Sequence, residues 1–415
     1  MLRIKPLSVL RPPAELAPAV ACVPYDVVNT QEARALAAGN PRSFLHVIRP
    51  DIDLPDEVDH HADIVYDTAK SAFERFQRDA TLTRDPQPAI YLYRQEMSLL
   101  GRRVSQTGVV CGCHTDDYNS GLIKKHEKTR KDKEDDRTRH VLTLSANAEP
   151  VFFLFKDDAA IGALIRADTA GTALYDFTAP DGVRHTVWRA APERAPLYTR
   201  AFGALPCAYV ADGHHRTASA ARAGAERRAA NPRHTGAEEY NWFLAVLFPA
   251  FALTILPYHR TVADLNGLTP EAVLKKIGAG ARVTPDASPE PASPGSVSMY
   301  IAGRWHGIAF PTESISRADP VRSLDSVILT ERILQPILGI GDIRTDTRID
   351  FVGGIRGPDE LRRRVDEGRA AIAFSMHAVT IEQLIAISDA GEIMPPKSTW
   401  FEPKLRSGLF VHTLD

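Results

Sequence analysis

The residue types best suited to chemistry gather in one short segment, Ala211-Asp212-Gly213-His214-His215-Arg216-Thr217. An apolar stretch that predicts a strand precedes it, and an alanine-rich stretch that predicts a helix follows it. Backbone N–H groups at the start of a helix attract anions, and Gly213 lets the backbone turn sharply or approach a ligand closely. Arg216 presents a planar group suited to phosphate oxygens, and two histidines can carry a proton or bind a metal near neutral pH. We therefore predict a phosphate-binding site here, against the simpler interpretation of a helix cap with surface histidines.

A second segment, from Lys124 to His140, is an unusually dense run of charge. Such a run is most often a solvated face or a mobile loop. The functional alternative is a basic loop that closes over a substrate, with its cations gripping phosphate and with His126 or Glu127 moving a proton. We interpret residues 124–140 as a loop and leave both roles open.

Three further segments carry weaker patterns: Pro24-Tyr25-Asp26, Tyr258-His259-Arg260, and the proline-stiffened stretch from Met394 to Phe401. Each places polar side chains beside a predicted strand or a rigid turn. Each could contact a ligand or could be local structure alone.

The elements that must position these residues alternate without a regular strand–helix–strand rhythm, which predicts an α+β fold with mixed sheets. Neither the dinucleotide-binding glycine pattern nor the P-loop pattern occurs. The predicted strands cover residues 43–48, 89–94, 104–113, 151–155, 184–188, 207–211, 243–248, 252–257 and 371–374, with a hairpin at 298–310 around Gly303. The predicted helices cover residues 31–38, 56–78, 161–166, 217–230, 268–277, 323–337, 361–367 and 380–390.

With 415 residues the chain exceeds the roughly 250–300 residues that one core usually serves, so more than one lobe is expected. We predict an N-terminal α+β lobe over residues 1–150 that contains the loop 124–140. A core lobe with the Asp212–Arg216 segment would span residues 151–290. An α+β segment over residues 291–415 would complete the fold.

Charge and hydropathy exclude some classes of protein. The formal net charge is −2, which gives no whole-chain support for nucleic-acid binding. No apolar run approaches the roughly 18 residues that span a bilayer, so we expect no membrane span. No secretory signal is visible at the N-terminus, which leaves the cytoplasm as the expected compartment and the four cysteines as reduced thiols. A small-molecule substrate is the expected partner, and a homo-oligomer is left open.

Several motifs together resemble a bacterial and archaeal family of unknown function, DUF1015. They are Pro24-Tyr25-Asp26-Val27-Val28, Asn40-Pro41, His126-Glu127-x-Thr129 with Arg137, Ala211 to Arg216, Pro257-Tyr258-His259-Arg260, and Met394 to Thr399. The Ala-Asp-Gly-His-His-Arg stretch of that family is similar to the phosphate-binding motif of ParB/sulfiredoxin-like proteins, which include free-serine kinases. One departure is Glu149, where a small polar residue would be expected. The resemblance implies a ParB/sulfiredoxin-like core with an additional α/β lobe.

The resemblance also implies an activity, that of a kinase-type phosphotransferase acting on free L-serine or a similar small hydroxy compound. The donor would be ATP, ADP or pyrophosphate, with Mg²⁺ neutralising the phosphates. By this analogy the catalytic residues are His126, Glu127, Asp212 and His215. The phosphate-binding residues are Gly213, His214, Arg216, Thr217, Lys125 and Arg137. The substrate-binding residues are Tyr25, Asp26, His259, Arg260, Lys397 and Ser398.

Two other functions remain as alternatives. A ParB-like regulator that binds DNA or a nucleotide is disfavoured by the charge and by the lack of a basic helix-turn-helix pattern. A metal-dependent hydrolase would use Asp212, His214 and His215 as ligands, although adjacent histidines rarely point at one metal.

Overall fold

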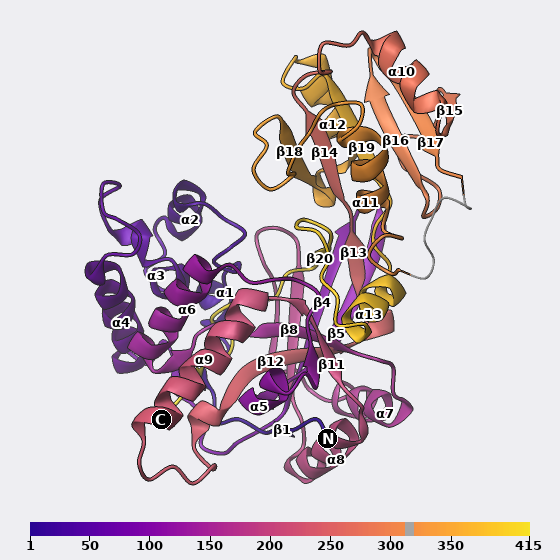
Figure 1. Cartoon of the computed structure of the whole chain (residues 1–415). Coiled ribbons are helices and arrows are strands. Elements are labelled where there is room, and N and C mark those ends of the chain that lie inside the picture. The colour runs from indigo at the N-terminus through magenta and orange to yellow at the C-terminus, as the bar shows by residue number, and fades with distance from the viewer. Residues whose placement is uncertain (312–318) are drawn as a thin grey trace. The chain divides into compact units, whose positions relative to one another are not determined.

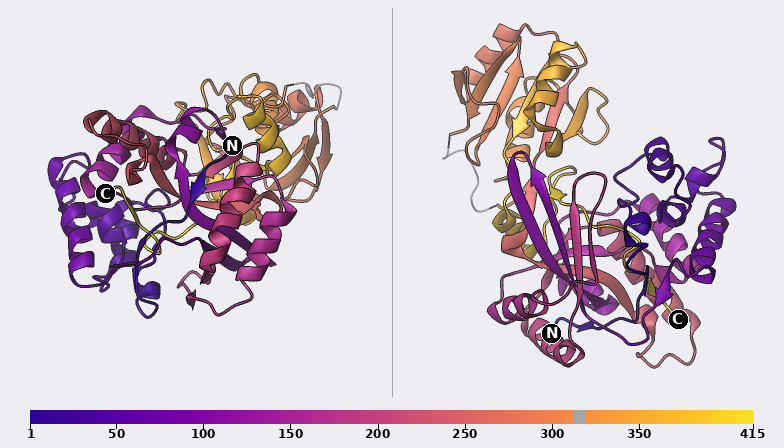
Figure 2. Two further views of the ribbon diagram at one scale, coloured as in Figure 1. Left: turned by 90° about the horizontal axis from the view of Figure 1, so that it is seen from below. Right: turned by 180° about the vertical axis from the view of Figure 1, so that it is seen from behind.

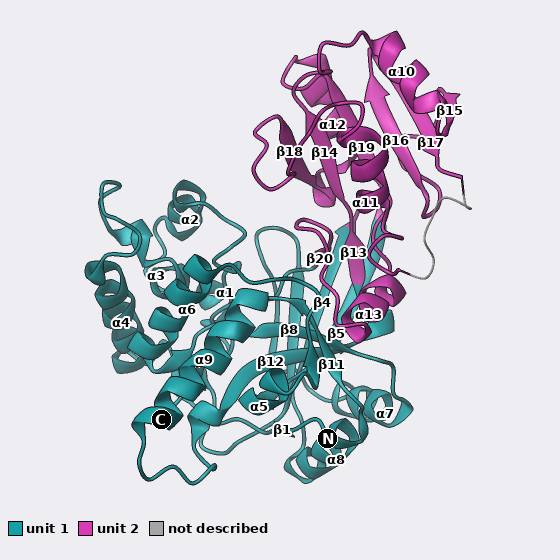
Figure 3. Ribbon diagram, in the orientation of Figure 1, with its two compact units in different colours: residues 1–98, 102–253, 403–415 teal, residues 99–101, 254–402 magenta. Residues whose placement is uncertain are grey.

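The computed structural model describes residues 1–311 and 319–415 as an α+β protein (Figure 1). The chain forms two compact units, shown in different colours in Figure 3. Unit 1 comprises residues 1–98, 102–253 and 403–415, and unit 2 comprises residues 99–101 and 254–402. These divisions differ from the predicted boundaries at 150 and 290. The strand at 243–248 completes the large sheet of unit 1, and the last 13 residues return to that unit, which local sequence patterns do not reveal.

Unit 1 is built on a mixed nine-stranded sheet. Its strands follow the order β6-β11-β8-β12-β5-β4-β10-β9, and β1 pairs with β5 off this path. Their bounds are β1 Ile4–Lys5, β4 Tyr91–Leu99, β5 Arg102–His114, β6 Ile123–Lys124, β8 Val151–Phe155, β9 Tyr175–Thr178, β10 Arg184–Arg189, β11 Ala208–Asp212 and β12 Trp242–Pro249. Because β11 joins β6 in parallel and β8 in antiparallel pairing, the candidate phosphate segment leaves the sheet beside the Lys124 region.

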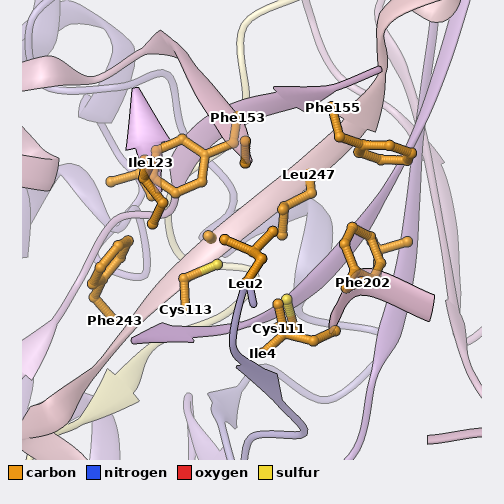
Figure 4. Packing of buried hydrophobic residues seen from close by; sticks show 14 of the residues in the cluster. Leu2, Ile4, Cys111, Cys113, Ile123, Phe153, Phe155, Phe202, Phe243 and Leu247 are labelled. Atoms are coloured by element: carbon orange, nitrogen blue, oxygen red, sulfur yellow. The ribbon is translucent and has the colours of Figure 1, made fainter. Parts of the chain in front are cut away.

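The core of unit 1 forms where alternate strand residues meet the helices behind them. Phe155 of β8 packs against Phe202 with ring centres 5.1 Å apart, Leu247 of β12 belongs to the same cluster, and Cys111 and Cys113 lie on the same face of β5 (Figure 4). All four cysteines of the chain are buried free thiols, as their spacing predicted.

Nine α-helices occur in unit 1, and α4, α6 and α9 lie next to one another (Figure 1). Their bounds are α1 Ala17–Val20, α2 Thr30–Ala37, α3 Leu45–Ile48, α4 Asp63–Arg78, α5 Thr115–Asn119, α6 Lys131–Leu144, α7 Ala159–Asp168, α8 Ala195–Ala204 and α9 His214–Ala230. Two short ladders, β2 Leu10–Arg11 with β3 Thr83–Arg84 and β7 Ala146–Asn147 with β21 His412–Thr413, complete the unit. The last of these holds the C-terminus in the same unit as the N-terminus (Figure 2). No helix in the described ranges is both long enough and apolar enough to cross a bilayer.

Unit 2 has a six-stranded sheet in the order β15-β17-β16-β19-β14-β18 and a separate pair, β13 with β20. The strands are β13 Thr254–Leu256, β14 Tyr258–Val262, β15 Arg282–Pro285, β16 Ser296–Ile301, β17 Arg304–Ala309, β18 Ile349–Gly353, β19 Ile372–Met376 and β20 Trp400–Glu402. The helices are α10 Pro270–Gly278, α11 Asp325–Leu329, α12 Gly357–Asp366 and α13 Ile381–Asp389. The predicted hairpin around Gly303 is confirmed as β16 and β17.

Two predicted elements were wrong. Residues 43–48, predicted as a strand, contain the short helix α3, because a brief apolar run does not distinguish a strand from a buried helical turn. Residues 124–140, predicted as a loop, are helical from Lys131 onward as α6. Its charges alternate in sign, with Lys131 and Asp135 paired one turn apart at 2.6 Å, while Thr138 and His140 face inward.

The close packing of α9 yields a first prediction. Gly224 lies in α9 where a Cβ would stand 2.4 Å from the carbonyl oxygen of Tyr240, so Gly224→Ala should lower the free energy of unfolding by about 1–3 kcal/mol. Gly162, inside α7, is the matched control, because a Cβ there meets only a flexible Arg166 side chain. Gly162→Ala should stabilise the protein by about 0.5–1 kcal/mol through helix propensity. Chemical denaturation of both variants checks this, and equal effects would contradict the packing described.

Candidate active site

The strand–helix junction at residues 211–214 turns sharply at Gly213. The register of β11 against β8 shifts between Val210 and Asp212, and Gly213 takes a left-handed φ of 84° just before α9 begins. No side chain caps α9. The N–H groups of its first turn therefore keep the anion-attracting character that the sequence predicted. Thr217 is fully buried and donates its hydroxyl to the carbonyl of Gly213 at 3.0 Å, so this side chain stabilises the turn.

Asp212 fixes the geometry of this turn through two contacts. Its Oδ1 accepts the Gly213 N–H at 2.7 Å, and its Oδ2 lies 2.7 Å from Nζ of Lys404. Burial alone would raise the pKa of Asp212, but Lys404 and Arg216 hold it well below its ordinary value. Asp212 is thus an ionised carboxylate with both oxygens engaged.

Arg216 contacts three segments of the chain beside the start of α9. Its guanidinium group lies so close to Gly213 that a Cβ there would be 3.2 Å from Nε. Nη1 donates to the carbonyl of Pro150 at 2.9 Å, and Nη2 lies 3.8 Å from the carboxylate of Asp26. Burial lowers the pKa of Arg216, and Asp26, Glu149 and Asp212 together outweigh that effect, so the group stays charged.

Glu149 is a buried carboxylate that joins the Tyr25 segment to the C-terminal segment. Its Oε1 accepts the N–H of Tyr25 at 3.1 Å and the hydroxyl of Ser407 at 3.0 Å. Burial raises the pKa of Glu149, while Arg216 opposes the rise. The side chain of Arg137 stacks over the ring of Tyr25 at 4.4 Å and donates to Asp136. The predicted residues Tyr25, Asp26, Arg137 and Arg216 therefore lie close together. They surround Glu149, which the sequence singled out only as a departure from the family pattern.

A cavity of about 30 Å³ adjoins these residues, and most of its lining is apolar. Its polar lining includes Arg137, Asn147, Glu149 and Arg216. Nη1 of Arg137, Oδ1 of Asn147 and Nε of Arg216 are buried and have no hydrogen-bond partner within residues 1–311 and 319–415. This volume is enough for about two water molecules. Buried polar atoms without protein partners are typical of cavities that hold water.

His126 and His214 form a buried pair near the helix start. Their rings meet edge to face with centroids 4.4 Å apart, and Nδ1 of His214 lies 3.6 Å from a carboxylate oxygen of Glu127. Burial lowers the pKa of His126 to about 4 and that of His214 well below its ordinary value. Both imidazoles are therefore neutral at pH 7. His126 is only 2% exposed, whereas nearly half of the Glu127 side chain is exposed.

His215 and His214 have different partners, although they are adjacent. Nε2 of His215 accepts the backbone N–H of Arg130 at 3.1 Å, which connects the start of α9 to the segment before α6. Lys125 is exposed, with Nζ 4.2 Å from the ring centre of Tyr118. Within the described residues no group of three histidine, cysteine or acidic side chains is arranged to hold a metal ion.

The other predicted substrate-binding residues belong to unit 2. His259 and Arg260 are buried on β14, and Nδ1 of His259 accepts the backbone N–H of Met376 at 3.1 Å. Arg260 lies 3.3 Å from the carbonyl of Lys397, and Ser398 donates to the carbonyl of Pro395 at 2.7 Å. These four residues form one neighbourhood within their own unit.

Sequence reasoning missed Lys404, Arg49 and the role of Glu149. Arg49 holds the Tyr25 segment by donating to the carbonyls of Tyr25, at 3.0 Å, and Val28. An isolated Lys or Arg has no local pattern that marks it as a partner of a distant segment. Of these three residues, only Glu149 was indicated by the sequence, through its departure from the family pattern.

The fold and this site define an α+β protein with an open, anion-attracting helix start bordered by buried charge. The family model described as "Protein of unknown function (DUF1015)" matches residues 4–327, and the chain belongs to this family. None of the curated proteins matches the chain.

Three solved structures show limited similarity. A free serine kinase in complex with AMP is 15% identical with a TM-score of 0.35, covering 71% of this chain and 86% of that chain. A conserved hypothetical protein from Pyrococcus furiosus is 14% identical with a TM-score of 0.35, covering 74% and 95%. SbnI from Staphylococcus aureus, with a C-terminal truncation, is 10% identical with a TM-score of 0.40, covering 73% and 87%. These values are too low to transfer a function.

The Asp212–Lys404 contact yields a second prediction. Lys404→Met should lower the free energy of unfolding by about 1–3 kcal/mol, because it leaves a mostly buried carboxylate without its cation. Lys131→Met is the matched control, since Lys131 makes an ion pair with Asp135 on the exposed surface of α6. The control should change stability by less than about 0.5 kcal/mol. Equal losses in chemical denaturation would contradict the account of the junction.

Proposed function

We propose that this protein is a phosphotransferase that moves a phosphoryl group from a nucleotide or pyrophosphate to the hydroxyl of a small molecule, with free L-serine as the first candidate. The observation that carries the proposal is the uncapped start of α9 behind a left-handed glycine. Backbone N–H groups in this arrangement bind phosphate in many unrelated proteins, because they are preorganised and the helix dipole favours negative charge.

The donor phosphates would lie against the N–H groups of His214 to Arg216. Phosphoryl transfer depends on positioning and on neutralising charge more than on covalent chemistry. Lys125 and Arg130 are exposed cations on this side of the helix. Arg216 adds a buried positive charge beside the helix start, and Thr217 stabilises the turn at Gly213.

We assign the proton acceptor for the substrate hydroxyl to Glu127. Its carboxylate is partly exposed and lies 3.6 Å from Nδ1 of His214, an imidazole that burial keeps neutral. His126 is too deeply buried to touch a substrate and would orient His214 through the ring contact. Asp212, with both oxygens engaged, would act as a positioning residue for the turn.

Mg²⁺ is expected to arrive with the donor, because this ion is usually held by substrate phosphates together with one or two carboxylates. Asp26 is an exposed carboxylate beside the helix start and would hold the ion, which would supply charge neutralisation there. Asp26 and Tyr25 would also border the acceptor.

Phosphorus NMR tests the function directly. The protein would be incubated with Mg²⁺ and L-serine in parallel samples that contain ATP, ADP or pyrophosphate. A new phosphomonoester signal at the O-phosphoserine position is the expected result in one sample. Loss of donor without that signal would retain phosphoryl transfer to water and reject serine. Intact donor in every sample, with a panel of small alcohols and hydroxy acids in place of serine, would reject the proposal.

Glu127→Gln tests the assigned proton acceptor. This variant should lower kcat by about 10²–10⁴-fold with little change in donor binding, because the amide cannot take the hydroxyl proton. The matched control is Asp135→Asn, which removes a partly exposed carboxylate of the same charge-rich segment whose partners are Lys131 and Arg222. The control should retain turnover, and unchanged turnover of Glu127→Gln would remove Glu127 from this role.

A further inference from the structure

Unit 2 contains a buried cation without an anionic partner in the described ranges. Arg260 on β14 is 3% exposed. Its guanidinium group donates to two backbone carbonyls, those of Tyr258 and Lys397, and lies 5.4 Å from the ring centre of Phe351. Among residues 1–311 and 319–415 no ion pair joins it to a carboxylate, and no charged neighbour offsets the effect of burial on its pKa.

This arrangement is costly unless something compensates for it. Burying a charged group away from water is unfavourable unless an opposite charge or a full set of hydrogen bonds replaces the solvent. Burial lowers the pKa of Arg260 to about 10, so the group still carries its charge at neutral pH. Two carbonyls and one aromatic face satisfy only part of a guanidinium group.

A hollow adjoins Arg260, and its lining is rich in hydrogen-bonding groups. Besides Arg260 it is lined by Asp325, Ser326, His377, Gln383 and Ser398. The hydroxyl of Ser326 is buried and has no hydrogen-bond partner among the residues that the structure describes. Asp325 is the acidic member, and its Oδ1 is occupied by the N–H of Gly295 at 2.7 Å.

We propose that this hollow binds an anionic group, a carboxylate or a phosphoryl group, with Arg260 as its counter-ion and the Ser326 hydroxyl as a second donor. The flat guanidinium group matches both kinds of anion. The space that a water-sized group can occupy is about 10 Å³, so one terminal oxygen of a ligand enters and the rest of the ligand lies outside. The site consists of residues of unit 2 alone and does not depend on the function proposed for the start of α9.

The test uses the full chain and compares the wild type with Arg260→Met and Arg356→Met. Arg356 is an exposed arginine of the same unit that does not line the hollow, and it serves as the matched control. Thermal unfolding and titration calorimetry would be run with sodium phosphate and with sodium acetate, each against sodium chloride at equal ionic strength. These two anions separate the phosphoryl and the carboxylate form of the ligand.

We expect one of the anions to raise the unfolding midpoint of the wild type and of Arg356→Met above the chloride value. Arg260→Met should bind that anion at least about tenfold more weakly and should show no anion-specific shift. In chloride, Arg260→Met should be at least as stable as the wild type, because it removes an uncompensated buried charge. Phosphate bound at α9 contributes equally to all three proteins and cancels in the comparison.

Equal anion responses in the wild type and in Arg260→Met would overturn the proposal, as would the absence of any response to both anions. If Arg260→Met fails to fold, Ser326→Ala decides. Severalfold weaker binding of the anion by Ser326→Ala supports the site, and unchanged binding overturns it.

Discussion

The site in unit 1 depends on the interactions of one buried guanidinium group, that of Arg216. It lies against Gly213, donates to the carbonyl of Pro150 and faces the carboxylates of Asp26 and Glu149. A buried charge must be compensated by opposite charges or hydrogen bonds. The segments that supply these groups are therefore held next to Arg216. The turn at Gly213 is therefore rigid before any ligand arrives, which is the condition for effective binding of a phosphate group.

The other buried charges of the site are likewise compensated by neighbouring groups. Lys404, near the C-terminus, neutralises Asp212, and Glu149 holds both Tyr25 and Ser407. Burial keeps the pKa of His126 low, so the imidazole pair adds no positive charge beside the cations already present. Positive charge thus remains at the helix start and on the exposed side chains of Lys125 and Arg130, and the partly exposed carboxylate of Glu127 is the group that we propose as the proton acceptor.

Local sequence patterns predicted the parts of the site that are local. The apolar run before Asp212, the glycine and the alanine-rich stretch gave the strand, the turn and the helix, with the helix beginning at His214 instead of Thr217. They could not give the contact of Asp212 with Lys404, which joins residues 192 positions apart, because nothing in either neighbourhood encodes the other. The helix α6 was missed for a different reason, since charges of alternating sign resemble a solvated loop until their spacing along a helix is considered.

In the proposed function, the start of α9 holds the phosphates of the donor. A crystal structure of the protein grown with Mg²⁺ and ADP or pyrophosphate tests it most directly. The account predicts phosphate oxygens within hydrogen-bond distance of the backbone N–H groups of His214 to Arg216, with Gly213 still in its left-handed conformation. A donor bound elsewhere, with these N–H groups free of phosphate, would contradict it.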